Sequence, residues 1–134
     1  MSETGKIQKK DFAKRTMHFG LRVIRLVESL PKSQTAHVIG NQLLRAGTSV
    51  GANYRSALRG KSRADFIAKL GIVEEECDEA LYWMQMLIEA GIVKNSRLVE
   101  LMNEADEIIA IVVSSIKTAR LRNNSPKSGI RNPK

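Results

Sequence analysis

The chain has 134 residues, a net charge of +8 and a single cysteine. This length suits one domain, and one cysteine excludes a disulfide within the chain. Aromatic residues make up only 4% of the sequence, so the core must consist mainly of Leu, Ile, Val, Ala and Met, which favours an all-α protein.

The first predicted helix runs from Lys10 to Leu30. Its apolar residues recur every three or four positions, the period of a helix that buries one face. Residues 1–9 are polar and are expected to form a flexible tail. Pro31 ends the helix, because the residue before a proline is pushed out of the α region.

A second helix is predicted from Ser33, its N-cap, to the turn at Gly60. It contains Gly40, Gly47 and Gly51, and each glycine costs about 1 kcal/mol relative to alanine inside a helix. Three such residues indicate either that another backbone passes close by or that the helix breaks near residues 47–52. A continuous helix with close packing is the preferred interpretation.

The third and fourth helices follow with equally short connections. Ser62, with Asp65 three positions on, has the order of a capping box, and Gly91 is a typical C-cap. The fourth helix is expected to start at Asn95 or Ser96 and to end near residue 122. Residues 123–134 are rich in Pro, Gly, Ser and basic residues and predict a disordered basic tail. Residues 10–122 therefore predict an antiparallel, up-down-up-down four-helix bundle.

Charge is distributed unevenly along these helices. Residues 31–62 contain five basic and no acidic side chains, whereas residues 63–95 contain seven acidic and three basic ones. We expect ion pairs between the two segments, within the bundle or between subunits. The candidates are Arg45, Arg63, Glu75 and Glu79. No metal site is predicted, because the Glu-x-x-His spacing of di-iron bundles is missing.

Other basic residues form a candidate groove for nucleic acid. On the first helix, Lys14, Arg22 and Arg25 share one side with His18. Near the end of the second lie Arg55, Arg59 and Lys61. Contacts from Arg and Lys to phosphates supply affinity without reading sequence. A polyanion such as RNA or DNA is therefore the expected partner, and a solvated basic surface is the alternative.

Three stretches of the sequence resemble a known family: residues 43–55 (LLRAGTSVGANYR), residues 61–70 (KSRADFIAKL) and residues 79–84 (EALYWM). They are similar to the bacterial four-helix-bundle family called S23 or 23S rRNA intervening-sequence protein, and the likeness covers residues 10–121. The resemblance implies an antiparallel bundle that assembles into a ring-shaped homopentamer. A related branch, the accessory variability proteins of diversity-generating retroelements, binds nucleic acid and a reverse transcriptase. Many members have Asn-x-x-Glu, but here Asn53 is followed by Tyr-Arg-Ser, so the acid is missing.

These observations predict a non-enzymatic, self-associating bundle that binds nucleic acid as an accessory factor of a complex containing RNA or a reverse transcriptase. The alternative is a structural module that assembles with proteins and has no role with nucleic acid. We expect no catalytic residue, no cofactor and no metal. The longest wholly apolar run, residues 108–113, is too short to cross a bilayer, and the start of the chain is polar. The expected location is therefore the cytoplasm.

Overall fold

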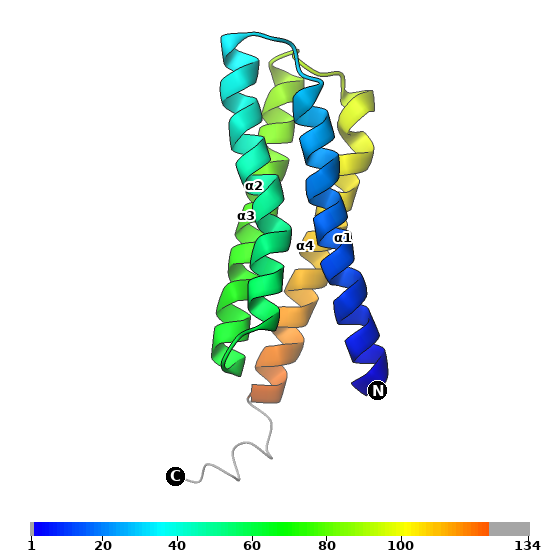
Figure 1. Ribbon diagram of the computed structural model, residues 1–134, viewed down its shortest axis with the longest axis vertical. Helices are drawn as coiled ribbons and strands as arrows, with labels where there is room; N and C mark the ends of the chain where they lie inside the picture. Colours follow the sequence, from blue (N-terminus) through cyan, green and yellow to red (C-terminus); the bar gives the residue numbers. More distant parts are fainter. Residues whose placement is uncertain (1, 124–134) are drawn as a thin grey trace.

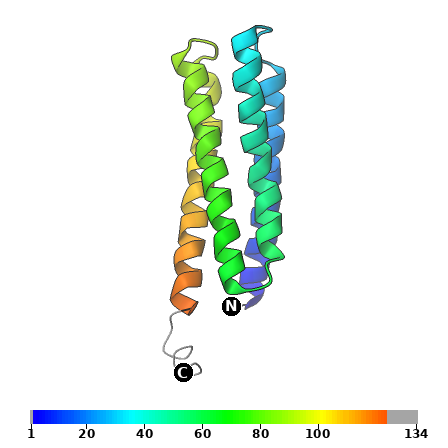
Figure 2. The same cartoon turned by 90° about the vertical axis from the view of Figure 1, so that its left-hand side faces the viewer.

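The computed structural model describes residues 2–123, with the side chains of residues 9–122. Four helices follow one another in the order α1 (Ser2–Glu28), α2 (Gln34–Leu58), α3 (Arg63–Glu89) and α4 (Asn95–Asn123). Each runs antiparallel to the one before it, and the four form one long bundle (Figures 1 and 2). The predicted four-helix bundle is therefore confirmed. Within the described residues, no helix is both long and apolar enough to span a membrane.

The start of α1 differs from the expectation that residues 1–9 form a tail outside the bundle. The helix begins at Ser2, eight residues before Lys10. Residues 3–9 contain no proline and several good helix formers, so the helix can continue past the last residue of the apolar stripe. At the other end of the chain, Asn123 is the last residue of α4, and residues 124–134 lie outside the described residues.

Local capping contacts set the ends of the middle helices. Ser33 and Ser62 each accept a hydrogen bond from the backbone N–H three residues on, at 3.1 Å and 3.0 Å. Asp65 does not return a bond to Ser62, and its carboxylate accepts from the backbone N–H of Lys61 at 3.1 Å instead. Gly91 has a φ of +75°, which only glycine adopts readily, and it ends α3.

The glycines of α2 let α1 pack closely against an unbroken helix, as the preferred interpretation predicted. A Cβ atom on Gly47 would lie 2.8 Å from both methyl groups of Val23. A Cβ atom on Gly51 would lie 3.2 Å from the backbone carbonyl carbon of Thr16. The backbone of α1 therefore passes beside α2 at the level of Gly51, and the helix continues without a break from Gln34 to Leu58.

The core is a continuous, mainly aliphatic column to which all four helices contribute. Phe19, Leu43, Leu70, Met84 and Ile108 are among its largest fully buried side chains. The four neighbouring helix pairs do not pack equally: α2 and α3 contact each other most extensively, and α1 and α4 least. In Figure 1, α1 leans away from α4 toward the end of the bundle where the chain starts. The seam between α1 and α4 is therefore the most open side of the bundle.

Candidate nucleic-acid interface

The six basic residues predicted to bind nucleic acid lie on the surface of the bundle. Arg22 is half-buried, and the other five are exposed: Lys14, Arg25, Arg55, Arg59 and Lys61. None of the six forms an ion pair with another described residue. They remain available to an external anion.

Arg22 and Arg25 border a shallow hollow between α1 and α4, near the end of α1. Arg97 joins them from the first turn of α4, and the hollow has a volume of about 360 Å³. A hydrogen bond of 2.8 Å from Arg97 Nη2 to Ser29 Oγ ties this arginine to the end of α1. We call Arg22, Arg25 and Arg97 the Arg22 cluster. It combines three guanidinium groups with one carboxylate, that of Glu100, at the rim of one hollow.

Arg97 was not among the predicted residues. It lies 72 positions from Arg25 in the sequence, and only the antiparallel return of α4 brings the two together. The predicted topology would have been sufficient to place Arg97 near Arg25. In an up-down-up-down bundle, the first turn of the fourth helix lies level with the last turn of the first.

Arg55, Arg59 and Lys61, which we call the Arg55 cluster, lie toward the opposite end of the bundle. Gly47 packs beside Val23, and α2 then runs away from the end of α1. With a rise of 1.5 Å per residue, Arg55 lies about 15 Å further along the axis than Arg25. The antiparallel direction of α1 and α2 therefore places the Arg22 cluster and the Arg55 cluster at different levels of the bundle, and a groove that joins them stays a prediction.

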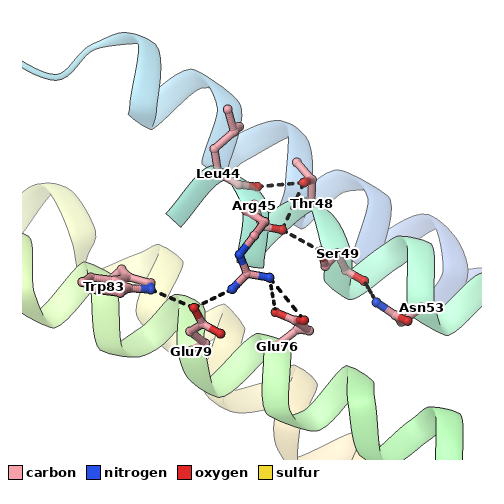
Figure 3. A network of polar contacts seen from close by, with 8 residues as sticks. All are labelled: Leu44, Arg45, Thr48, Ser49, Asn53, Glu76, Glu79 and Trp83. Carbon is pink, nitrogen blue, oxygen red and sulfur yellow. Dashed lines mark hydrogen bonds and ion pairs between the residues drawn. The ribbon is translucent and has the colours of Figure 1, made fainter. Parts of the chain in front are cut away.

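Arg45 links α2 to α3 through two carboxylates (Figure 3). Its Nη1 atom donates to Glu76 Oε1 at 3.1 Å, and its Nη2 atom donates to Glu79 Oε2 at 2.5 Å. Trp83 Nε1 donates to the same oxygen of Glu79 at 3.1 Å. The hydrogen bond from Arg45, followed by that from Trp83, lowers the pKa of Glu79. This network connects neighbouring helices of one chain, so the charge of Arg45 is already engaged by two carboxylates.

The other two residues predicted to form ion pairs lie elsewhere. Glu75 and Arg63 are exposed, and neither forms an ion pair with another described residue. Glu76 takes the place expected for Glu75, because successive residues of a helix point about 100° apart and only Glu76 and Glu79 face Arg45. Arg63 opens α3 at the end of the bundle opposite the Arg22 cluster.

A second network, not predicted, joins α1 to α4. Arg15 Nε donates to Glu104 Oε2 at 2.6 Å, and Arg15 Nη2 donates to Glu104 Oε1 at 2.8 Å and to Glu107 Oε1 at 2.6 Å. The hydrogen bond from Arg15 is the main cause of the lowered pKa of Glu104, and the charges of Arg22 and His18 add to it. Arg15 is therefore a structural cation, unlike the residues of the Arg22 cluster.

Comparison with known proteins supports the predicted family. The family model described as 23S rRNA-intervening sequence protein matches residues 8–114. The chain is also similar to a crystal structure of a protein of unknown function from the S23 ribosomal protein family of Bacteroides thetaiotaomicron VPI-5482. The two are 35% identical with a TM-score of 0.76 over 81% of this chain and 97% of the other. No curated protein matches the chain. The family model spans most of the bundle, and the chain therefore belongs to the 23S rRNA-intervening sequence protein family.

Proposed function

We propose that this protein is a non-enzymatic, self-associating bundle that binds RNA or DNA through the phosphate backbone. It acts in the cytoplasm as an accessory factor of a complex that contains RNA or a reverse transcriptase. The observation that carries this proposal is the Arg22 cluster, in which arginines from two helices border one hollow and form no ion pairs among the described residues. Arginine presents several donors in a planar fork that suits phosphate oxygens.

The charge of the chain supports the same function. The net charge is +8, and among the described residues the ion pairs between helices engage two arginines, Arg15 and Arg45, each with two carboxylates. The excess positive charge is therefore displayed by other residues, including the Arg22 and Arg55 clusters. The two clusters are offset by about 15 Å along the axis, and we propose that one bound strand of several nucleotides contacts both.

The test is fluorescence anisotropy with a labelled single-stranded RNA, a single-stranded DNA and a duplex, each titrated at rising salt. We expect binding at low salt, and the logarithm of the binding constant should fall linearly with the logarithm of the salt concentration. On duplex DNA, each neutralised phosphate adds nearly one unit to that slope. The variant Arg22→Glu with Arg25→Glu should lose most of the affinity. The matched control is Lys117→Glu with Arg120→Glu, which makes the same charge change on α4 and should lose much less.

Two results would contradict the proposal: no binding at low salt, or an affinity that does not respond to salt. An equal loss in the variant and in its control would show that only net charge matters, and would remove the role of the Arg22 cluster. The Arg55 cluster is tested in the same way with Arg55→Glu and Arg59→Glu. We expect a partial loss, because part of the strand still contacts the Arg22 cluster.

A second candidate function is a structural module that assembles with proteins. It is favoured by Met17 and Leu21, which lie one turn apart on α1 and are 63% and 43% exposed. Exposed apolar residues that adjoin each other are typical of protein contacts. We further propose that a homopentamer is the assembled form. Native mass spectrometry of the wild type and of Met17→Glu with Leu21→Glu tests it, and the expected outcomes are a pentamer and a smaller species.

A further inference from the structure

A groove opens at the end of the bundle where α1 begins and α4 ends. It has a volume of about 990 Å³ and is lined by residues of all four helices. It lies on the open side of the bundle, where α1 leans away from α4 (Figure 1). The volume falls in the range of small-molecule sites, roughly 300–1,000 Å³. This groove, which we call the end groove, does not include the Arg22 cluster.

The inner wall of the end groove is apolar. Phe12 and Tyr54 meet edge to face, with ring centroids 4.7 Å apart and an interplanar angle of 89°. These two side chains are only 8% and 5% exposed, so little of either ring face is free for a planar base to stack on. Phe66 and Ile111 extend the wall onto α3 and α4. Such a wall suits an aliphatic chain, which needs apolar contact but no open ring face.

The rim of the end groove is cationic. Its lining includes four basic residues and one acid, Asp11, although one of the four, Arg15, is already paired with Glu104 and Glu107. The Nζ atom of Lys9 lies 5.6 Å from the centroid of the Phe66 ring, and Arg63 precedes Phe66 by one helical turn. Residues three apart on a helix share a face, so Lys9 and Arg63 both lie beside Phe66. Neither forms an ion pair with another described residue.

We propose that the end groove binds a small amphipathic anion: an unbranched aliphatic chain that ends in a carboxylate or a phosphate. The aliphatic chain lies against Phe12, Phe66 and Ile111, and the anionic head lies between Lys9 and Arg63. The exposed hydroxyl groups of Ser114 and Thr118 on α4 line the same groove and can donate further hydrogen bonds to the head. The anionic head complements the basic residues of the rim, and the aliphatic chain packs against the apolar wall.

Isothermal titration calorimetry of the full chain tests the proposal with three probes of equal chain length. The probes are decanoate, decyl phosphate and decyltrimethylammonium, each below its micelle concentration. We expect saturable binding of one decanoate or decyl phosphate per chain, and the tighter of the two identifies the head group. Decyltrimethylammonium should bind at least about tenfold more weakly, which corresponds to about 1.4 kcal/mol. Equal binding of the cation, or no saturable binding of either anion, overturns the proposal.

Two variants and a matched control locate the site. Ser114→Trp places an indole in the groove, and Lys9→Glu with Arg63→Glu reverses the charge of the rim. Both should abolish decanoate binding, and circular dichroism checks that each is folded. If Ser114→Trp fails to fold, Lys9→Glu with Arg63→Glu still tests the location of the site. The control, Lys32→Glu with Lys94→Glu, makes the same charge change at the other end of the bundle. It should bind as the wild type does, and an equal loss there contradicts the proposed location.

Other occupants of the groove give distinct results. A membrane surface is tested by co-sedimentation with phosphatidylglycerol vesicles. Co-sedimentation without decanoate binding in solution overturns the proposal in favour of lipid contact. A second copy of the chain is tested by sedimentation velocity of Ser114→Trp. If this substitution lowers the oligomeric mass, the groove is covered by a neighbouring subunit and the proposal is wrong. An unchanged mass, together with lost decanoate binding, supports it.

Discussion

Arg15 on α1 and Glu104 on α4 face each other across the most open seam of the bundle, with two hydrogen bonds of 2.6 Å and 2.8 Å between them. They are 89 positions apart in the sequence. The side chains are 34% and 18% exposed, so water screens the attraction only in part. Since α1 and α4 contact each other least of the four neighbouring helix pairs, we expect this contact to matter more for the seam than it would between closely packed helices.

The first prediction concerns this contact. Arg15→Ala leaves the partly buried carboxylate of Glu104 without its main partner, and we expect the free energy of unfolding to fall by about 1 to 2 kcal/mol. Urea denaturation followed by circular dichroism measures it. Lys14→Ala is the control, because Lys14 is the exposed neighbour and forms no ion pair among the described residues. Equal losses in the two variants would exclude a special role for Arg15.

The second prediction concerns pH. The pKa of Glu104 is lowered mainly by Arg15, and that of Glu79 mainly by Arg45, from an ordinary value of 4.5. A carboxyl group whose pKa is lower in the folded state contributes stability above its unfolded pKa. That stability is lost as the pH falls through the folded value. The free energy of unfolding should therefore decrease as the pH is lowered from 4.5.

The variant Glu104→Gln checks the origin of this pH dependence, because glutamine does not titrate. Urea denaturation at about pH 7 and about pH 3 should show a smaller decrease in Glu104→Gln than in the wild type. Glu75→Gln is the control, since Glu75 is exposed and forms no ion pair among the described residues. An identical pH dependence in the wild type and in Glu104→Gln would refute the assignment.

The third prediction compares two glycines inside helices. Gly47→Ala should lower the free energy of unfolding by about 1 to 3 kcal/mol, because the new methyl group meets Val23 at 2.8 Å. Gly71→Ala should raise the free energy of unfolding by up to about 1 kcal/mol. A Cβ atom on Gly71 would meet no atom of another element within 4 Å, and alanine favours the helix. Thermal denaturation measures both, and adding Val23→Ala to Gly47→Ala should recover part of the loss. Stabilisation by Gly47→Ala would contradict the close packing of α1 and α2.

The fourth prediction concerns Cys77, which is fully buried. Burial, followed by the charges of Asp106, Asp78 and Glu104, raises the pKa of its thiol to about 12. Only the thiolate reacts with iodoacetamide, so at about pH 8 the folded protein should react at least about 100-fold more slowly than the protein in urea. The control is Ala52→Cys in a Cys77→Ala background, because Ala52 is exposed on α2. Comparable rates at the two positions would disprove the burial of Cys77.

Contacts between near neighbours in the sequence could be predicted, because they depend on residue type and spacing alone. Ser33 and Ser62 cap their helices through N–H groups three residues away. Gly91 ends α3 because it can adopt a positive φ. Because a glycine inside a helix costs stability, close packing at Gly47 could be predicted. The sequence did not show that its partner would be Val23.

Contacts between distant helices were harder to predict, since they depend on how each helix is rotated about its axis. The sequence indicated that acids on α3 would meet Arg45 and named Glu79, yet the second partner is Glu76 and not Glu75. Successive residues of a helix point about 100° apart. Where several acids are consecutive in the sequence, periodicity alone does not show which of them faces the neighbouring helix. The Arg15 network was missed for the same reason, because Glu104 approaches only after the chain has turned three times.

An even number of antiparallel helices has a practical consequence for experiments. Ser2 and Asn123, the two ends of the described chain, lie at the same end of the bundle (Figure 1). The Arg22 cluster lies toward the other end. A fluorescent reporter or an affinity tag joined directly before Ser2 or after Asn123 therefore starts at the end of the bundle opposite the Arg22 cluster. A short linker between the two ends should also allow a circular permutant, with new ends in the loop between α2 and α3. Labelled versions of the protein can thus be used in binding measurements without covering these arginines.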